Sequence, residues 1–167
     1  FIGLSNADYQ YAVEEYWKGN YETALKEFQM LAETQNNGLA QMWLYWIYST
    51  GEEGIDKDED LSEARRKKSE SSLKFMAMQG DPEAQYWHGE NLGDDYNEGS
   101  WFIKSFNGFL LAANQGDPYA QGWTAENYLY GEGVDKDVEL GMSWLLKSAQ
   151  GGNAYYQNMY GVRLQSS

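Results

Sequence analysis

The chain contains no cysteine, and histidine occurs only once, as His88, among its 167 residues. The absence of cysteine excludes disulfide bonds, thiolate metal sites and a cysteine nucleophile. A Ser-His-Asp arrangement would need His88, and nothing in the sequence places a nucleophile beside it. We interpret His88 as a packed, hydrogen-bonded residue of the core, and we expect no catalytic residues.

Basic residues are also scarce, because 12 Lys and Arg stand against 26 Asp and Glu, for a formal charge of −14. A surface of this sign repels phosphate backbones and anionic lipids, so we expect no nucleic-acid partner. The complementary partner is a basic protein, and long-range attraction would speed its association. No apolar run approaches the roughly 20 residues that a membrane helix needs, so no membrane insertion is expected.

Proline is rare, with two residues, whereas glycine occurs 18 times. This balance favours helices separated by glycine-containing turns over a proline-rich linker. Hydrophobic residues make up 42% of the chain and aromatic residues 16%, which is enough for a core. The length fits a single domain over 1–167, and no low-complexity stretch marks a boundary inside it.

A short segment recurs along the chain at a fixed interval, which is the signature of a repeat architecture. The segment Gly80–Gln85 returns 36 residues later as Gly116–Gln121 and, more weakly, as Gly152–Gln157. An earlier copy, Gly38–Gln41, ends 44 residues before Gln85. The eight additional residues are expected in the polar stretch 56–72, which implies a longer second helix there.

Apolar residues follow each copy at helical spacing. They fall on one face of a helix, the periodicity that an amphipathic helix requires. The members of this face are Ala40, Leu44, Tyr45 and Tyr48 in one unit and Ala120, Thr124, Ala125 and Tyr128 in another.

Each such helix ends at a glycine-rich turn, clearest at 130–137 and nearly copied at 50–58. Glycine supplies the positive φ that ends a helix, and Asp58 or Asp137 can cap the next one. A second helix follows, for example at Gly141–Ala149. The unit is therefore helix, turn, helix, and stacked units bury the apolar face that one unit alone cannot.

The pattern Ala-Gln-x-x-Leu-Gly-x-x-Tyr-x-x-Gly-x-Gly-Val-x-x-Asp, followed by Trp, resembles the Sel1-like repeat, a relative of the tetratricopeptide repeat. The best match is Ala120 to Asp137 with Trp144, and Gly19–Phe28 is closer to a tetratricopeptide repeat. The third unit departs from the pattern at His88 and in the turn 94–99.

The resemblance implies an all-α fold, an α/α superhelical solenoid of about four repeats plus a C-terminal capping helix. The predicted units are 5–36, 37–80, 81–116 and 117–152, with the cap at 153–167. We expect eight or nine helices in antiparallel pairs and no sheet. The expected helix starts lie near Ala7, Leu39, Pro82, Pro118 and Asn153.

In the family that this pattern resembles, the first helices of the repeats line the concave side, where a ladder of Trp residues would form a protein-binding groove. Trp43, Trp87 and Trp123 share one repeat position, which points away from the apolar face, and Gly122 leaves room for a partner beside Trp123. An alternative remains open, in which these Trp residues pack between repeats and never contact a partner. The Glu candidates are expected at the surface. The candidate partner-binding residues are Trp43, Trp46, Trp87, Glu90, Asn91, Trp123, Glu126, Asn127, Tyr130 and Met159.

The acidic turns do not form a recognisable metal site. Asp56, Asp58 and Asp60 match the first ligands of a calcium loop, but Leu61 stands where glycine is needed and Lys67 where the closing Glu belongs. We interpret these carboxylates as helix caps and solvated turn residues.

Other site motifs are missing from the sequence: a phosphate-binding glycine loop, a Gly-x-Ser-x-Gly elbow and paired histidines on a helix. The basic cluster Arg65–Lys68 is interpreted as a solvated helix face. We therefore expect neither a metal nor a cofactor.

The sequence predicts a binding module rather than an enzyme. Small acidic Sel1-like proteins resemble periplasmic immunity proteins that neutralise phospholipase effectors of the type VI secretion system, so a basic toxin is the expected partner. An adaptor or scaffold in signalling or envelope processes is the alternative, and a hydrolase is a remote one. The chain begins at Phe1 without Met, so we expect an upstream segment, either a cleaved signal peptide or a piece outside this sequence. The expected location is periplasmic, with a cytoplasmic location as the alternative.

Overall fold

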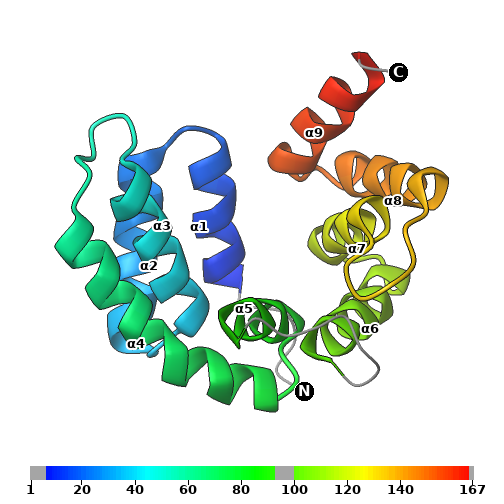
Figure 1. Cartoon of the computed structure of the whole chain (residues 1–167). Helices are drawn as coiled ribbons and strands as arrows, with labels where there is room; N and C mark the ends of the chain where they lie inside the picture. Colours follow the sequence, from blue (N-terminus) through cyan, green and yellow to red (C-terminus); the bar gives the residue numbers. More distant parts are fainter. Residues whose placement is uncertain (1–6, 93–99, 166–167) are drawn as a thin grey trace. The chain divides into compact units, whose positions relative to one another are not determined.

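The computed structural model describes residues 7–92 and 100–165 and is entirely helical there apart from turns (Figure 1). The predicted all-α fold is confirmed, and the helices start within one residue of the expected positions. The predicted turn at 94–99 lies outside the described residues. The nine helices of the described ranges are α1 Ala7–Trp17, α2 Tyr21–Thr34, α3 Gly38–Thr50, α4 Glu59–Met78, α5 Pro82–Leu92, α6 Trp101–Asn114, α7 Pro118–Tyr130, α8 Val138–Gln150 and α9 Ala154–Gln165.

The chain divides into two compact units, residues 1–88 and 89–167, and the division falls inside α5. In the first unit, α2 packs against both α1 and α3, and α3 packs against α4. In the second unit, α7 packs against α6 and α8, and α8 packs against α9. Within each unit these consecutive helices are therefore neighbours, as expected for a helical repeat.

The helices begin where the sequence places short polar caps. The side chains of Asp58 and Asp137 accept hydrogen bonds from the backbone N–H groups of Leu61 and Leu140, at 2.8 and 2.9 Å, so the predicted caps are confirmed. Gly131 follows α7 with φ 79°, the left-handed conformation that ends a helix with little strain in glycine.

Helix α4 is the longest of the described helices, with 20 residues, whereas α8 has 13. The additional residues of this unit were expected in the stretch 56–72, and α4 contains most of that stretch. No helix among the described residues combines the length and the apolar character needed to cross a membrane.

The glutamine of each Ala-Gln pair ties its helix to the preceding one. Its Nε2 atom donates to the carbonyl of an alanine near the end of that helix, over 3.0–3.4 Å. Three of these carbonyls also accept the backbone N–H of the glycine three residues on, so the glutamine adds a second hydrogen bond at the helix end. The pairs are Gln41 with Ala32, Gln85 with Ala77, Gln121 with Ala113 and Gln157 with Ala149.

Candidate functional site

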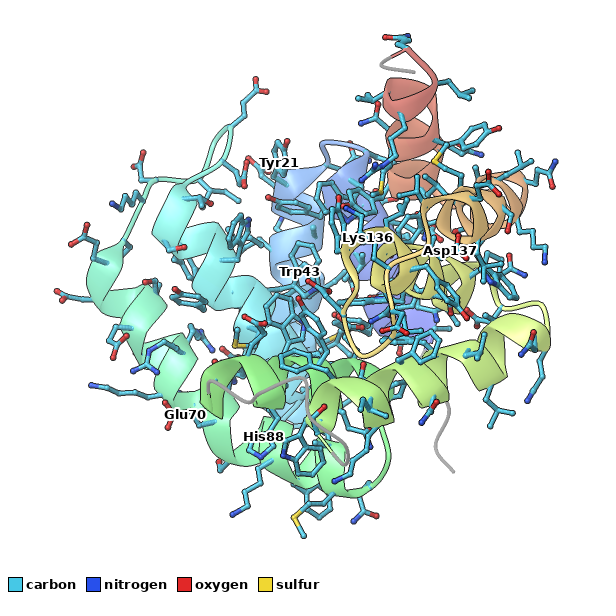
Figure 2. All side chains as sticks on the ribbon, turned by 45° about the vertical axis from the view of Figure 1, so that its right-hand side comes forward. Tyr21, Trp43, Glu70, His88, Lys136 and Asp137 are labelled. Atoms are coloured by element: carbon cyan, nitrogen blue, oxygen red, sulfur yellow. The ribbon has the colours of Figure 1, made fainter. Side chains whose placement is uncertain are left out.

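Trp43 lies among the helices of the first unit, where Figure 2 labels it. Its ring stacks on Phe28 of α2, with centroids 5.2 Å apart and planes 6° apart. Its indole N–H donates to the Tyr9 hydroxyl over 2.8 Å, and Tyr9 donates to the buried carboxylate of Glu83 over 2.6 Å. Trp43 therefore packs between consecutive helices, as in the alternative left open by the sequence.

Trp123 repeats this arrangement in the second unit. Its ring stacks on Phe109 of α6, with centroids 4.9 Å apart and planes 4° apart. Trp87 and Met159, which share the repeat position, are both half-buried. A sequence signal does accompany this packing. A fully buried residue stands 14 or 15 positions before each of Trp43, Trp87, Trp123 and Met159. These buried residues are, in the same order, Phe28, Leu73, Phe109 and Leu145.

Trp46, one turn after Trp43, remains 52% exposed. Its indole N–H donates to the Tyr16 hydroxyl, which in turn donates to the Glu52 carboxylate. Burial, together with the hydrogen bond to Glu52, raises the pKa of Tyr16 well above its ordinary value. The exposed ring is thus connected by a hydrogen bond to the buried Tyr16 side chain.

Trp17, at the end of α1, lies on the other side of Tyr16. Its ring meets the Tyr16 ring edge-on, with centroids 5.2 Å apart, and lies 6.1 Å from that of Trp43. Trp17 is 43% exposed. We call Tyr16, Trp17, Trp43 and Trp46 the N-terminal aromatic face. Trp17 and Tyr16 were missed by the sequence analysis because the first unit does not follow the spacing of the later repeats.

A shallow, open depression continues this face at the turns after α1 and α3. Asn20, Tyr21, Glu22 and Glu53 are among its lining residues. The Tyr21 ring, labelled in Figure 2, lies 5.2 Å from the Tyr16 ring, which joins the depression to the aromatic face. Two exposed carboxylates therefore flank an aromatic surface within one compact unit.

Glu126 and Asn127, expected at a partner surface, serve the interior of the second unit. Glu126 is half-buried and accepts a hydrogen bond from the Tyr156 hydroxyl of α9, so its predicted surface position is wrong. Asn127 is buried, and its Nδ2 donates to the Glu132 carbonyl over 2.7 Å, which closes the turn after α7. The cause in both cases is tertiary packing, which the helical periodicity of α7 alone does not show.

Gly122 does not leave room for a partner beside Trp123, contrary to the expectation. A Cβ atom added there would lie 1.8 Å from the Tyr156 ring, so α9 already occupies this space. Tyr130, in contrast, is exposed, and its hydroxyl accepts a hydrogen bond from Arg163 over 2.8 Å. Tyr130 thus remains accessible, although Arg163 of α9 contacts its hydroxyl.

The remaining candidates lie on α5. Glu90 and Asn91 are exposed, and His88 is half-buried rather than part of the fully buried core. Figure 2 labels His88, and also Lys136 and Asp137 in the turn before α8. Among the described residues, no group of three or more His, Cys, Asp or Glu side chains is arranged to hold a metal ion.

The environment of Glu126 predicts a pH dependence. Desolvation raises its pKa to about 7, with Glu132 adding to the effect and Tyr156 and Arg163 opposing it. Because the folded-state pKa exceeds the unfolded one, this group stabilises the fold fully below about pH 4.5 and loses that contribution as pH rises through 7. We expect the free energy of unfolding to fall by about 2 kcal/mol between pH 5 and pH 8, after allowance for partial exposure.

The Glu126→Gln variant retains an oxygen acceptor for Tyr156 and removes the titration. Urea unfolding at both pH values should show the fall in the parent and not in the variant. Equal pH dependence in the two proteins would rule out Glu126 as its source.

The described residues define an all-α helical repeat protein. No protein-family model matches the chain, and no curated protein matches it either. Solved structures that match include a protective antigen present in uropathogenic Escherichia coli strains, which displays an SLR fold; it is 29% identical, with a TM-score of 0.40 over 83% of this chain. The match covers 28% of that protein, so this chain spans well under a third of its length. Another is a Sel1 repeat protein from Oxalobacter formigenes, 26% identical with a TM-score of 0.39, covering 82% of this chain and 96% of that one.

Proposed function

We propose that this chain is a protein-binding repeat scaffold and that its partner docks on the N-terminal aromatic face. The observation that carries the proposal is the exposure of Trp46 and Trp17 on helices that are otherwise well packed. Tryptophan is highly buried on average, and it is enriched among residues that dominate binding energy at protein interfaces. The hydrogen bond to Tyr16 holds Trp46 in place, so little side-chain entropy is lost on binding.

Replacing Trp46 by Ala should weaken partner binding by about 2 kcal/mol, or roughly thirtyfold, because the central contact is removed. The free energy of unfolding should change by less than about 1 kcal/mol, since the ring is half exposed. The parent and Trp46→Ala chains serve as baits in native extracts, and the protein retained by the parent is then purified and titrated against both.

Phe75→Ala is the matched control, because Phe75 is an aromatic residue of the same unit, is 66% exposed and lies on α4. The control should bind as the parent does. Equal affinities for the parent, Trp46→Ala and Phe75→Ala would exclude the aromatic face as the docking surface.

The more specific form of the proposal is a periplasmic immunity protein that neutralises a secreted toxin such as a phospholipase effector. It is supported by the acidic charge of −14 and by the resemblance of the repeat pattern to the Sel1-like family. Blocking a toxin requires only a preorganised surface and no chemistry. Co-expression with a toxin encoded beside its gene should protect cells, and Trp46→Ala should lose that protection while remaining folded. A folded parent chain that gives no protection would leave the adaptor role.

A further inference from the structure

The charge of the first unit is unevenly distributed. Residues 7–56, which form α1 to α3 and the following turn, contain nine acidic and two basic residues. Helix α4 contains four acidic and five basic residues. The negative charge of this unit is therefore concentrated on the helices that present Trp17 and Trp46, whereas α4 is nearly neutral.

The aromatic face offers the surfaces that a cation requires. Trp46 is 52% exposed and Trp17 43% exposed, and the indole ring is the strongest of the aromatic side chains in attracting a cation to its face. Both rings are oriented by Tyr16, so the platform exists before a ligand arrives.

Carboxylates stand within the same surface. Glu52 accepts the Tyr16 hydroxyl at the edge of the aromatic face. Glu22 and Glu53 line the depression that Tyr21 joins to that face, and both are exposed. The carboxylates of Glu22 and Glu53 are thus connected to the aromatic face through the rings of Tyr21 and Tyr16.

The one basic cluster of the chain is engaged by its own helix and by α2. Arg66 bonds to Glu63 and Glu70, each at 2.8 Å, and Arg65 lies 3.6 Å from Glu33 of α2. A second copy of this chain could offer Arg65 or Arg66 to the aromatic face only by breaking these ion pairs. Charge complementarity thus favours a different, basic protein.

We propose that the N-terminal aromatic face and its acidic depression bind an arginine-containing segment of the partner, a proposal that rests on the proposed protein-binding function. A guanidinium stacks on Trp46 or Trp17, and a neighbouring arginine pairs with the carboxylates of Glu22 and Glu53. Arginine suits this surface better than lysine, because its planar group stacks on aromatic rings and forms paired hydrogen bonds with carboxylates.

The test uses an eight-residue peptide of alternating arginine and glycine, blocked at both ends and carrying a fluorophore. Citrulline replaces arginine in a control peptide, which keeps the shape of the side chain and removes its charge. Fluorescence anisotropy should show binding of the arginine peptide to the parent chain that is at least tenfold tighter than that of the citrulline peptide. Raising the salt concentration from 50 to 500 mM should weaken the binding of the arginine peptide severalfold, because salt screens the attraction between charges.

Two variants locate the bound peptide, and two controls measure general attraction to an acidic protein. Trp46→Ala should weaken arginine-peptide binding about tenfold and Glu53→Gln about threefold. Phe75→Ala removes an exposed aromatic residue on α4, and Glu139→Gln removes an exposed charge on α8; both should bind as the parent does. Thermal unfolding confirms that each variant is folded. Trp17→Ala tests the other exposed ring of the aromatic face in the same way.

The outcomes separate this inference from the proposed function. If Glu139→Gln weakens binding of the arginine peptide as much as Glu53→Gln does, the peptide is attracted by the overall negative charge of the chain, and the proposed arginine site is wrong. If binding of the purified partner depends on Trp46 but the arginine peptide does not displace it, the proposed protein-binding function is supported and the proposed arginine segment is wrong. Peptide binding that depends on Trp46 and Glu53, together with displacement of the partner, supports both.

Discussion

Replacing Trp43 by Ala is expected to lower the free energy of unfolding by about 3–5 kcal/mol, the usual cost of removing a packed tryptophan. The change removes the stack on Phe28, whose side chain is fully buried, and the hydrogen bond to Tyr9. It leaves a void between α2 and α3 and takes one member from the chain of bonds that runs through Tyr9 to Glu83.

The control is Trp46→Ala, which removes the same side chain three residues later on the same helix. Because Trp46 is half exposed, its loss should cost less than about 1 kcal/mol. Guanidinium unfolding followed by circular dichroism measures both variants against the parent. A cost below 1 kcal/mol for Trp43→Ala would mean that this ring is not part of the packing between helices.

Trp43→Phe separates the two contributions. It retains a ring that can stack on Phe28 and removes the indole donor to Tyr9. The expected cost is about 1–2 kcal/mol, which includes the lost hydrogen bond and the smaller ring.

Replacing Gly122 by Ala should destabilise the second unit by about 3 kcal/mol. The added methyl group would lie 1.8 Å from the Tyr156 ring, a distance that no side-chain contact allows. The ring must move, and overpacking of this kind typically costs 1–3 kcal/mol or more. Because Tyr156 is the residue of α9 buried against α7, we expect α9 to detach first and to become the earliest site of proteolysis.

Gly161→Ala is the matched control, since Gly161 also lies in a helix and has no neighbouring atom within 4 Å of an added Cβ. It should be neutral or stabilising by up to about 1 kcal/mol, because alanine favours a helix over glycine. If Gly122→Ala is as stable as Gly161→Ala, α9 does not pack on α7 as described. The double variant Gly122→Ala/Tyr156→Ala should cost less than the sum of the two single changes, because the clash exists only when both groups are present.

The helix boundaries were predictable because their signals are local. Asp58 and Asp137 stand directly before the helices that they cap, and each cap needs only a backbone N–H three residues on. The longer α4 followed from the spacing between repeat copies. These features depend on neighbours in the sequence, so they can be inferred from the residues alone.

The candidate site was harder to predict because exposure depends on packing between helices. Trp43 and Trp46 both lie opposite the apolar arc of α3, yet only Trp46 stays largely accessible, because Phe28 of α2 covers Trp43. Glu126 was expected at the surface and is half-buried, because α9 supplies Tyr156 against it. A helical wheel shows the direction in which a side chain points, but it does not show which residues of the neighbouring helices cover that side chain.

The role of glutamine in the Ala-Gln pairs also required the structure. The bond from Gln85 to the Ala77 carbonyl spans eight residues across a turn, and no helical periodicity encodes it. The recurrence of the pair therefore has a physical reason, since each glutamine ties its own helix to the end of the preceding one.

The most direct test of the proposed docking surface is site-specific crosslinking, which the absence of cysteine from the sequence makes clean. Ser49→Cys places one thiol on α3 within a turn of Trp46, and Ser71→Cys places one on the exposed surface of α4. Each is labelled with a short photoactivatable crosslinker and mixed with the purified partner. Docking on the N-terminal aromatic face predicts a covalent adduct from position 49 that is lost when Trp46→Ala is added, and little or none from position 71. An adduct from position 71 without one from position 49 would contradict docking on the N-terminal aromatic face.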